Sequence, residues 1–225
     1  MNLFDDIYKT LIEGDKWILL LQGLGNTLLI SLGAILIGTV IGCFLALFKI
    51  SKSKILRGIA TTYTSIVRGI PLATQLMIFY FVIFSPMGFS NKIVVAILGF
   101  GINSGAYVTE IIRAGIQGVD KGQMEAGRSL GLSKSQTMIR IILPQAIKSA
   151  LPTYTSEFIA LIKETSVASF IGVMDLTKAS DMIRNATYNA WIPLISAAVI
   201  YLILTLGLTK IFSMLERRLS RSDRG

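Results

Sequence analysis

The sequence predicts an all-α integral membrane protein with five transmembrane helices, and three observations support this fold class. First, 52% of the 225 residues are hydrophobic and only 16% are charged, whereas a soluble domain of this size usually carries about 25% charged residues. Second, apolar-dominated runs of roughly 20 residues recur, which is the length that a helix needs to cross a ~30 Å hydrocarbon core. Third, most basic residues lie between these runs.

Five runs define the expected helices, all within one transmembrane domain that covers residues 1–225. They span residues 17–48, 66–84, 93–118, 153–174 and 191–214. Pro71 lies near the start of the second run, where the first helical turn tolerates a proline. The first and third runs carry small residues that let helices pack closely, namely Gly33, Gly38, Gly42, Gly99, Gly101 and Gly105. Internal packing is the favoured interpretation, and a dimer face or a sliding surface is the alternative.

Loop charges predict the orientation of these helices. Four bases without an intervening acid follow the first run: Lys49, Lys52, Lys54 and Arg57. Residues 113–148 hold six bases against two acids, whereas residues 175–184 are balanced and the loop between the second and third runs offers only Lys92. The C-terminal tail adds four arginines: Arg217, Arg218, Arg221 and Arg224. Because cytoplasmic loops are enriched in Lys and Arg, the sequence predicts an N-out, C-in topology.

Several classes of protein are excluded by composition. The formal net charge of +9 does not indicate nucleic-acid binding, because the bases cluster between apolar runs without interleaved aromatic residues. Cys43 is the single cysteine and the chain has no histidine, which removes Ser-His-Asp catalysis, Cys-His catalysis and the usual zinc spacings. The sequence holds no G-x-x-x-x-G-K-[ST] loop to cradle phosphates. Any energy for transport must therefore come from a partner or from a gradient.

A polar stretch, "QMEAGRSLGLSKSQTMIRIILPQAI", follows the third run and covers residues 123–147. Gly131 is expected to adopt φ > 0 and to end a first helix. Ser133 is a candidate N-cap for the next helix. Pro144 comes too late for the first turn, so a break or kink is expected there. The stretch therefore predicts two short helices at an angle, outside the membrane, suited to docking in a groove of another protein.

The spacing of this stretch resembles a known family motif. Glu125-Ala126-Gly127, three residues, Gly131, nine residues and then Ile141-Ile142-Leu143-Pro144 resemble the EAA loop of permease subunits of ATP-binding cassette importers. Gly127 departs from the Ala that the family often has, which weakens the helix by up to roughly 1 kcal/mol. The stretch from Arg68 to Leu72 resembles the R-G-T-P-L motif of the polar amino acid (His/Glu/Gln/Arg/opine) branch, with Ile70 in place of Thr. The resemblance covers nearly the whole chain.

The resemblance implies a division of labour between chains. It places a coupling helix within a cytoplasmic loop of about residues 119–150, carried by Gln123, Glu125, Ala126, Gly127, Gly131 and Leu132. This helix would dock on a nucleotide-binding ATPase subunit that holds ATP and Mg, so this chain would need no cofactor and would perform no covalent chemistry. Further implied partners are an identical or related permease subunit in a dimer, a solute-binding protein and an amino acid substrate. The implied location is the bacterial cytoplasmic (inner) membrane, as a multi-pass protein that rocks between two openings.

Charged residues within the fourth run are candidate substrate contacts. Glu157, Lys163 and Glu164 lie in an apolar background, where a charge costs ~2.5–3.5 kcal/mol on insertion scales and so usually marks a function. Glu157 and Glu164 are seven residues apart and share one helix face. A carboxylate pair there could attract a cationic side chain or hold a substrate ammonium. The alternatives are an ion pair with Lys163, which points about 100° away, or an interhelical pair with Arg113.

Other polar residues of the predicted helices have weaker assignments. Asn103 is expected to line the pathway or to bond a neighbouring backbone, and Gln75 is a further pathway candidate. Glu110 is expected to form a local ion pair with Arg113, three residues later. Arg68 has two interpretations, which are contact with lipid headgroups and a gate or inter-subunit contact.

The acidic face favours a substrate class. We expect import of polar, cationic amino acids by alternating access, coupled to a separate ATPase. Glutamine or cystine import is the alternative. A stand-alone channel or gradient-driven transporter would not need the docking segment, and a passive membrane scaffold has little reason to retain Glu157 and Glu164.

Overall fold

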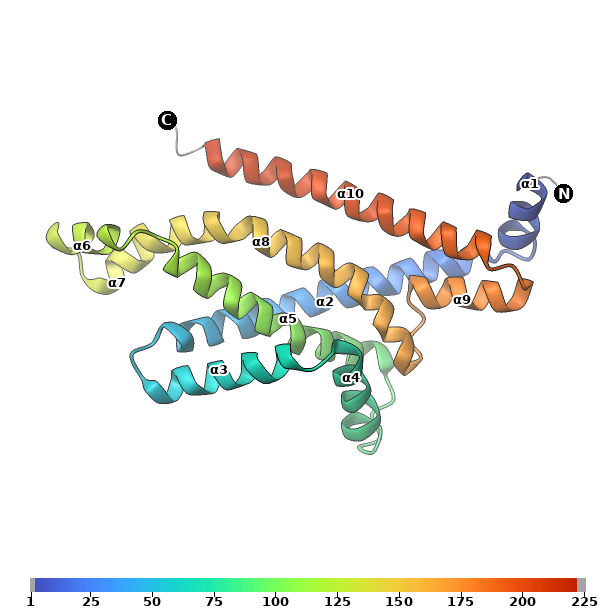
Figure 1. Ribbon diagram of the computed structural model, residues 1–225, viewed down its shortest axis with the longest axis horizontal. Coiled ribbons are helices and arrows are strands. Elements are labelled where there is room, and N and C mark those ends of the chain that lie inside the picture. Colours follow the sequence, from blue (N-terminus) through green and yellow to red (C-terminus); the bar gives the residue numbers. More distant parts are fainter. Residues whose placement is uncertain (1–2, 222–225) are drawn as a thin grey trace.

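The computed structural model describes residues 3–221 as a set of long helices and short helical turns, without a strand in that range (Figure 1). Arg224 of the predicted basic tail lies outside the described residues. The elements in chain order are α1 (Leu3–Ile7), η1 (Tyr8–Ile12), α2 (Trp17–Ile50), α3 (Lys54–Gly69), α4 (Leu72–Met77), η2 (Ile78–Phe84), α5 (Lys92–Gln117), α6 (Lys121–Ser129), α7 (Lys134–Thr137), η3 (Met138–Ile142), α8 (Leu143–Glu164), η4 (Thr165–Ile171), α9 (Leu176–Thr187) and α10 (Trp191–Arg221).

The core of the fold is the contact between α2 and α5, and glycines bring these helices together. A Cβ atom at Gly42 would lie 2.5 Å from Cγ1 of Val108, and one at Gly101 would lie 2.8 Å from Cγ2 of Ile37. Real side chains do not approach so closely, so both positions require glycine. The glycines therefore pack helices of the same chain, as the favoured interpretation predicted. Phe100 is fully buried in the resulting core.

The prediction of one continuous second helix over residues 66–84 is wrong. The chain breaks between α3 and α4, and the two segments are bent by 102°. Ile70 is extended, with φ −107° and ψ 134°, because the ring of Pro71 disfavours helical backbone at the residue before it. Pro71 thus ends one helix and begins another instead of lying inside a first turn.

The predicted break at Pro144 is also corrected. α6 is a separate short helix, but α7 runs through the π-helical turn η3 directly into α8. The N–H of Leu143 donates to the carbonyl of Met138, five residues earlier. This wider π turn lets the helix continue although Pro144 has no N–H to donate. One short helix and one long one therefore replace the two short helices expected from the sequence.

The fourth predicted helix, residues 153–174, is displaced. α8 begins ten residues earlier, at Leu143, and ends at Glu164, where the 3₁₀ turn η4 follows. Gly172 then adopts φ +74° and ends that turn. The other three expected helices match α2, α5 and the first part of α10.

By length and composition, three helices of the described chain can cross a membrane: α2, α5 and the Trp191–Arg218 part of α10. The bent pair of α3 with α4 and η2 makes a fourth if it forms one span. α8 has 22 residues but is more polar, because it carries Lys148, Glu157, Lys163 and Glu164. The count of five spans therefore stays a prediction.

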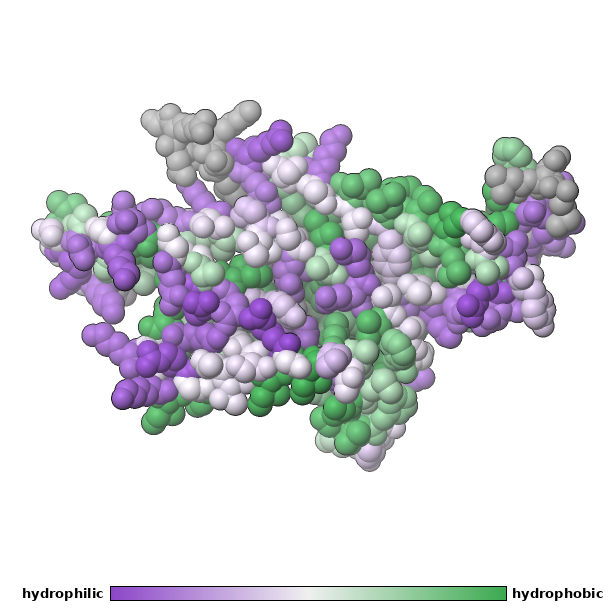
Figure 2. All heavy atoms as spheres, in the orientation of Figure 1, coloured by the Kyte–Doolittle hydropathy of each residue, from purple (hydrophilic) through white to green (hydrophobic). Residues whose placement is uncertain are grey.

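The molecule has two distinct ends. α6, α7 and the connection from α2 to α3 lie at one end, toward which the C-terminal half of α10 also points, and α1 and α9 lie at the other (Figure 1). Hydrophilic side chains cover the end that holds α6 and α7, whereas apolar side chains cover much of α10 and the region of α4 (Figure 2). The segments predicted to be cytoplasmic thus share an end. The direction in which that end faces stays a prediction.

Candidate substrate pathway and coupling segment

Gln75 holds the break between α3 and α4. Its side-chain amide donates to the carbonyl of Val67 at 2.5 Å and to that of Ile70 at 2.7 Å. The carbonyl of Val67 would ordinarily accept from residue 71, but a proline has no N–H, so the Gln75 amide replaces the missing donor. Nδ2 of Asn103 in turn donates to Oε1 of Gln75 at 3.3 Å. The structure thus joins the two amides, both of them buried, and their contact with substrate stays a prediction.

Glu157 on α8 is the first candidate substrate contact. Its carboxylate is half-buried and accepts a hydrogen bond from Oγ of Ser104 on α5 at 3.3 Å. Glu164, two turns further along α8, is exposed. The charges of Glu164 and of Arg68 both lie close enough to act on Glu157. The carboxylate of Glu157 thus has one acidic and one basic neighbour within electrostatic range.

Arg68 is oriented by an aromatic ring. It lies in the last turn of α3, next to the break, and its guanidinium carbon is 5.0 Å from the ring centroid of Tyr107 on α5. Such a cation–π contact holds a guanidinium without neutralising its charge. Arg68 therefore remains able to bind an anionic group. Ser104 and Tyr107 could not be predicted from the sequence, because neither a serine nor a tyrosine is unusual in a membrane helix.

Glu110 forms the ion pair that was predicted for it. Nε of Arg113 lies 2.7 Å from its carboxylate, and Lys49 at the end of α2 contacts the other oxygen. Arg113 also donates to Gln117. Arg113 is therefore held at Glu110 and Gln117, away from the alternative partner Glu157. The contribution of Lys49 could not be found from spacing, since it lies on another helix.

The polar stretch ends its first helix as predicted. Gly131 adopts φ +85°, its N–H donates to the carbonyl of Arg128, and the N–H of Leu132 donates to that of Gly127. These two bonds form a Schellman motif. Ser133 then caps α7, where it forms a capping box with Gln136. Both predictions about backbone geometry in this stretch are confirmed.

Gly127 has a packing role that the sequence did not reveal. It is buried on the face of α6 that packs against the following helical turns. A Cβ atom at this position would lie 2.5 Å from Cγ2 of Thr137 and 3.1 Å from Cδ1 of Ile141. The glycine therefore lets α6 fold back closely on α7 and η3. Glycine lowers the helix propensity of α6, but a larger residue at this position would prevent the close approach.

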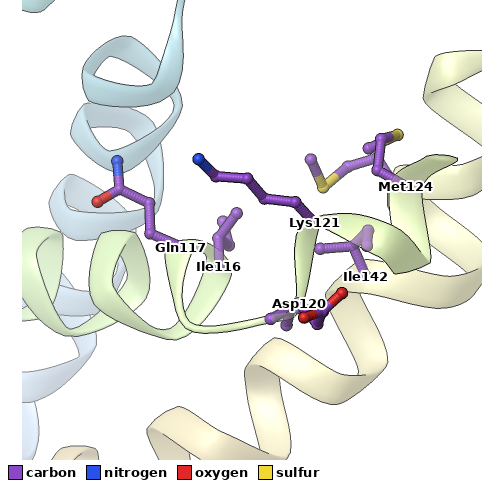
Figure 3. Close-up of a pocket in the computed structure, with 8 residues that line it drawn as sticks. Ile116, Gln117, Asp120, Lys121, Met124 and Ile142 are labelled. Carbon is purple, nitrogen blue, oxygen red and sulfur yellow. The ribbon is translucent and has the colours of Figure 1, made fainter.

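An open cavity of about 490 Å³ lies beneath α6 (Figure 3). Its walls come from the end of α5, the start of α6 and η3, and include Ile116, Met124, Met138 and Ile142. Asp120 begins α6 by accepting from the N–H of Gly122 at 2.6 Å. Methionines suit a contact surface because their flexible side chains adapt to a partner. Leu130, at the outer end of α6, is 81% exposed.

A family model described as the binding-protein-dependent transport system inner membrane component matches residues 38–221. The chain belongs to this family. Together with the relatives and the solved structure described next, this match confirms the resemblance to permease subunits of ATP-binding cassette importers of amino acids.

Named relatives and solved structures agree with this family. The chain is 45% identical to a provisional glutamine transport system permease, GlnP, of Rickettsia bellii, over 91% of this chain and 94% of that protein. It is 42% identical to the arginine transport system permease ArtQ of Bacillus subtilis, over the same shares. A crystal structure of an amino acid ABC transporter with histidines matches with a TM-score of 0.87 and 39% identity, over 97% of this chain and 99% of that one. The methionine transporter MetNI, at 21% identity and a TM-score of 0.78, covers 89% and 96% and shows the fold alone.

The end of the permease opposite α6 is built around α9. Asp175 is fully buried and caps α9 by accepting from the N–H groups of Thr177 and Lys178. Burial raises the pKa of the Asp175 carboxyl, and those N–H groups oppose the rise. On the outer face of α9, a hydrogen bond from Lys178, together with the charge of Arg184, lowers the pKa of Asp181. At this end the buried Asp175 caps α9. The charge of Asp181 is paired with Lys178 and Arg184 on the same helix.

Proposed function

We propose that this chain is the transmembrane subunit of an ATP-driven importer that moves polar, cationic amino acids across the bacterial cytoplasmic membrane. The observation that carries the proposal is the half-buried carboxylate of Glu157, which lies beside Ser104 and within range of Arg68 and Glu164. Intramembrane carboxylates are costly and mark substrate paths. The transport names of the relatives GlnP and ArtQ support an amino acid as the cargo.

The arrangement fits the chemistry of an amino acid. Glu157 would attract the α-ammonium group or a cationic side chain, with Glu164 adding charge at the exposed end of the same face. Arg68, held by Tyr107 but not neutralised, would pair with the α-carboxylate, for which a guanidinium is well suited. Gln75 and Asn103 would support the site indirectly, because their hydrogen bonds hold the break between α3 and α4 next to Arg68.

The transport cycle would depend on other chains. Residues Gln123–Leu132 would dock on an ATPase subunit that binds ATP and Mg, and hydrolysis there would move α6 as a lever. A second permease subunit, identical or related, would complete the path, and a solute-binding protein would deliver the substrate at the end that holds α9. In this proposal the chain crosses the membrane five times, N-out and C-in, with α8 as the span that carries the charges.

Glutamine import is the second candidate, because the Rickettsia relative is a glutamine permease by name. Arg68 would then offset part of the charge of Glu157, leaving a site for a neutral zwitterion. Cystine import is a further alternative. Action as a stand-alone channel or gradient-driven transporter has less support, because the coupling segment would then have no partner.

The first test is reconstitution in liposomes with the cognate ATPase and solute-binding protein. ATP hydrolysis would be measured with Arg, Lys, His, Gln, Glu and cystine. We expect stimulation by Arg or Lys. Stimulation by Gln alone would favour the second candidate, and failure to associate with the ATPase would overturn the importer.

The second test changes the acidic face. Glu157→Gln keeps the size of the side chain and removes its charge, so uptake of Arg and Lys should fall at least about tenfold, which corresponds to one lost charge contact. Uptake of Gln should fall much less. Glu125→Gln, in the coupling helix, is the matched control and should affect all substrates equally. An equal loss for all substrates in Glu157→Gln would fit contact with the α-ammonium group that they share, and would remove the argument for cationic side chains.

A further inference from the structure

A second cavity, of about 690 Å³, lies where the connection from α2 to α3 approaches α7. We call it the basic cavity and define it by three cations, Lys49, Arg57 and Lys134, and three apolar side chains, Ile50, Ile116 and Met138. Its volume falls in the range of about 300–1,000 Å³ that is typical of small-molecule sites. None of its lining residues is acidic. Its cations come from three different elements, so the site exists only in the folded chain.

The charges of the basic cavity are unevenly compensated. Lys49 is paired with Glu110. Within the described residues, neither Arg57 nor Lys134 takes part in an ion pair, and both are exposed. The cavity therefore holds two uncompensated cations and would favour an anion. A guanidinium and an ammonium that line one cavity suit a phosphate group, which both bind readily.

The apolar half of the basic cavity indicates what carries that anion. Ile50 is the last residue of the apolar helix α2, and Ile116 and Met138 line the same space. On α3, Ile55 is 76% exposed and Ile59 is 53% exposed, and both lie on the helix face opposite Arg57. Exposed isoleucines in the first turns of α3 are expected if this part of the helix contacts lipid. The cavity thus joins a cationic wall to an apolar one at the edge of the membrane-facing surface.

We propose that the basic cavity binds the phosphate of an anionic phospholipid headgroup, with the glycerol backbone against Ile50 and Ile116. The cavity shares Ile116 and Met138 with the cavity beneath α6. A bound headgroup would therefore contact residues that also support α6, and would link the membrane surface to the coupling segment. Transport by this permease would depend on anionic lipid through this contact, in addition to the general attraction of basic loops to an anionic surface.

The test measures lipid retention by the intact transporter. The permease–ATPase complex would be purified from nanodiscs of phosphatidylcholine with phosphatidylglycerol, and the bound lipid would be counted by native mass spectrometry. We expect preferential retention of phosphatidylglycerol and a loss of about fivefold for each charge removed in Arg57→Gln/Lys134→Gln. The control, Lys52→Gln/Lys54→Gln, removes two cations of the same connection that do not line the cavity. It should lose less than about twofold.

Three results would overturn the proposal. An equal loss in both double variants would show attraction to surface charge alone. No preference for phosphatidylglycerol in the unchanged protein would show that the cavity binds no anionic lipid. Displacement of phosphatidylglycerol by millimolar inorganic phosphate or glycerol 3-phosphate would retain an anion site but overturn the lipid as its occupant. Should Lys134→Gln detach the ATPase, Arg57→Gln alone, on α3, keeps the test decisive.

Discussion

Pro71 and Pro144 each remove a backbone donor where a helix could run on, and the outcomes are opposite. At Pro71 the helix stops, and its direction changes by 102° between α3 and α4. At Pro144 the helix continues, because the wider π turn η3 accommodates a residue that has no N–H. In an uninterrupted helix, residue 71 would donate to the carbonyl of Val67 and residue 144 to that of Arg140. Val67 is buried, whereas Arg140 is exposed.

We infer that this difference in residue burial decides how each carbonyl is satisfied. A carbonyl that loses its donor near the surface can turn to water at little cost. A buried carbonyl cannot, and an unsatisfied buried acceptor costs roughly 1–3 kcal/mol. Gln75 supplies the replacement donor at Val67, and Asn103 holds Gln75 from α5. The break at Pro71 is thus held by buried side chains beside Arg68, whereas the turn at Pro144 is a local change in helix geometry.

The largest effect is expected from Gln75→Leu. It removes the donor to two carbonyls and the acceptor of Asn103, so the free energy of unfolding should fall by about 2–5 kcal/mol. The midpoint of thermal unfolding in detergent should fall by roughly 5 °C or more. Gln145→Leu is the matched control, since Gln145 donates to the carbonyl of Ile141 at 2.9 Å beside Pro144 but is exposed. It should change the midpoint by no more than about 2 °C. Equal effects would refute burial as the deciding factor.

The next effect is expected from Gly127→Ala, where α6 packs on the turns that precede Pro144. The new Cβ would lie 2.5 Å from Cγ2 of Thr137, and such overpacking costs typically about 1–3 kcal/mol. The ATPase stimulation by substrate should fall with it, because α6 would be displaced.

A second-site change tests this contact directly. Thr137→Ser removes Cγ2 and keeps the hydroxyl that donates to the carbonyl of Ser133. The double variant Gly127→Ala/Thr137→Ser should recover most of the lost stability in a double-mutant cycle. Additive losses would show that the close approach of α6 to Thr137 does not carry the effect.

Gly131→Val should have a smaller effect on stability, about 1–2 kcal/mol. A Cβ at Gly131 would meet no atom within 4 Å, so the cost is only that of φ +85° for a residue with a side chain. We expect normal membrane insertion with reduced coupling of ATP hydrolysis to transport. Gly131→Asn is the control, because Asn tolerates this backbone region better, and it should keep most of the coupling. Normal transport by Gly131→Val would contradict a role for this turn in coupling.

Local backbone chemistry was the part of this structure that the sequence predicted best. Gly131 and Ser133 depend on neighbouring residues only, and both were predicted correctly. The pair of Glu110 with Arg113 follows from helical spacing. The family motif in residues 125–144 was also readable without a structure, because it is a pattern of letters along the chain.

Contacts between distant segments were not predictable in the same way. Nothing near Pro71 in sequence shows that Gln75 turns back to Val67, or that Asn103 meets it from α5. Gly127 looked like a small weakness of a helix, since Thr137 becomes its neighbour only after the chain turns at Gly131. The position of α8 was misjudged by ten residues, because the π turn continues the helix through Pro144, where the sequence rule expects a stop.

The smallest effect on stability is expected from Pro144→Ala. The substitution restores an N–H that can donate to the carbonyl of Arg140 and so allows η3 to become α-helical. Since Arg140 is exposed, the free energy of unfolding should change by less than about 1 kcal/mol. Removing the wider turn would nevertheless rotate α7 relative to α8 by part of a helical turn. We therefore expect a nearly unchanged midpoint of thermal unfolding and a clear loss of substrate-stimulated ATP hydrolysis. A fall in the midpoint as large as that of Gln75→Leu would mean that the two prolines are alike and that the comparison fails.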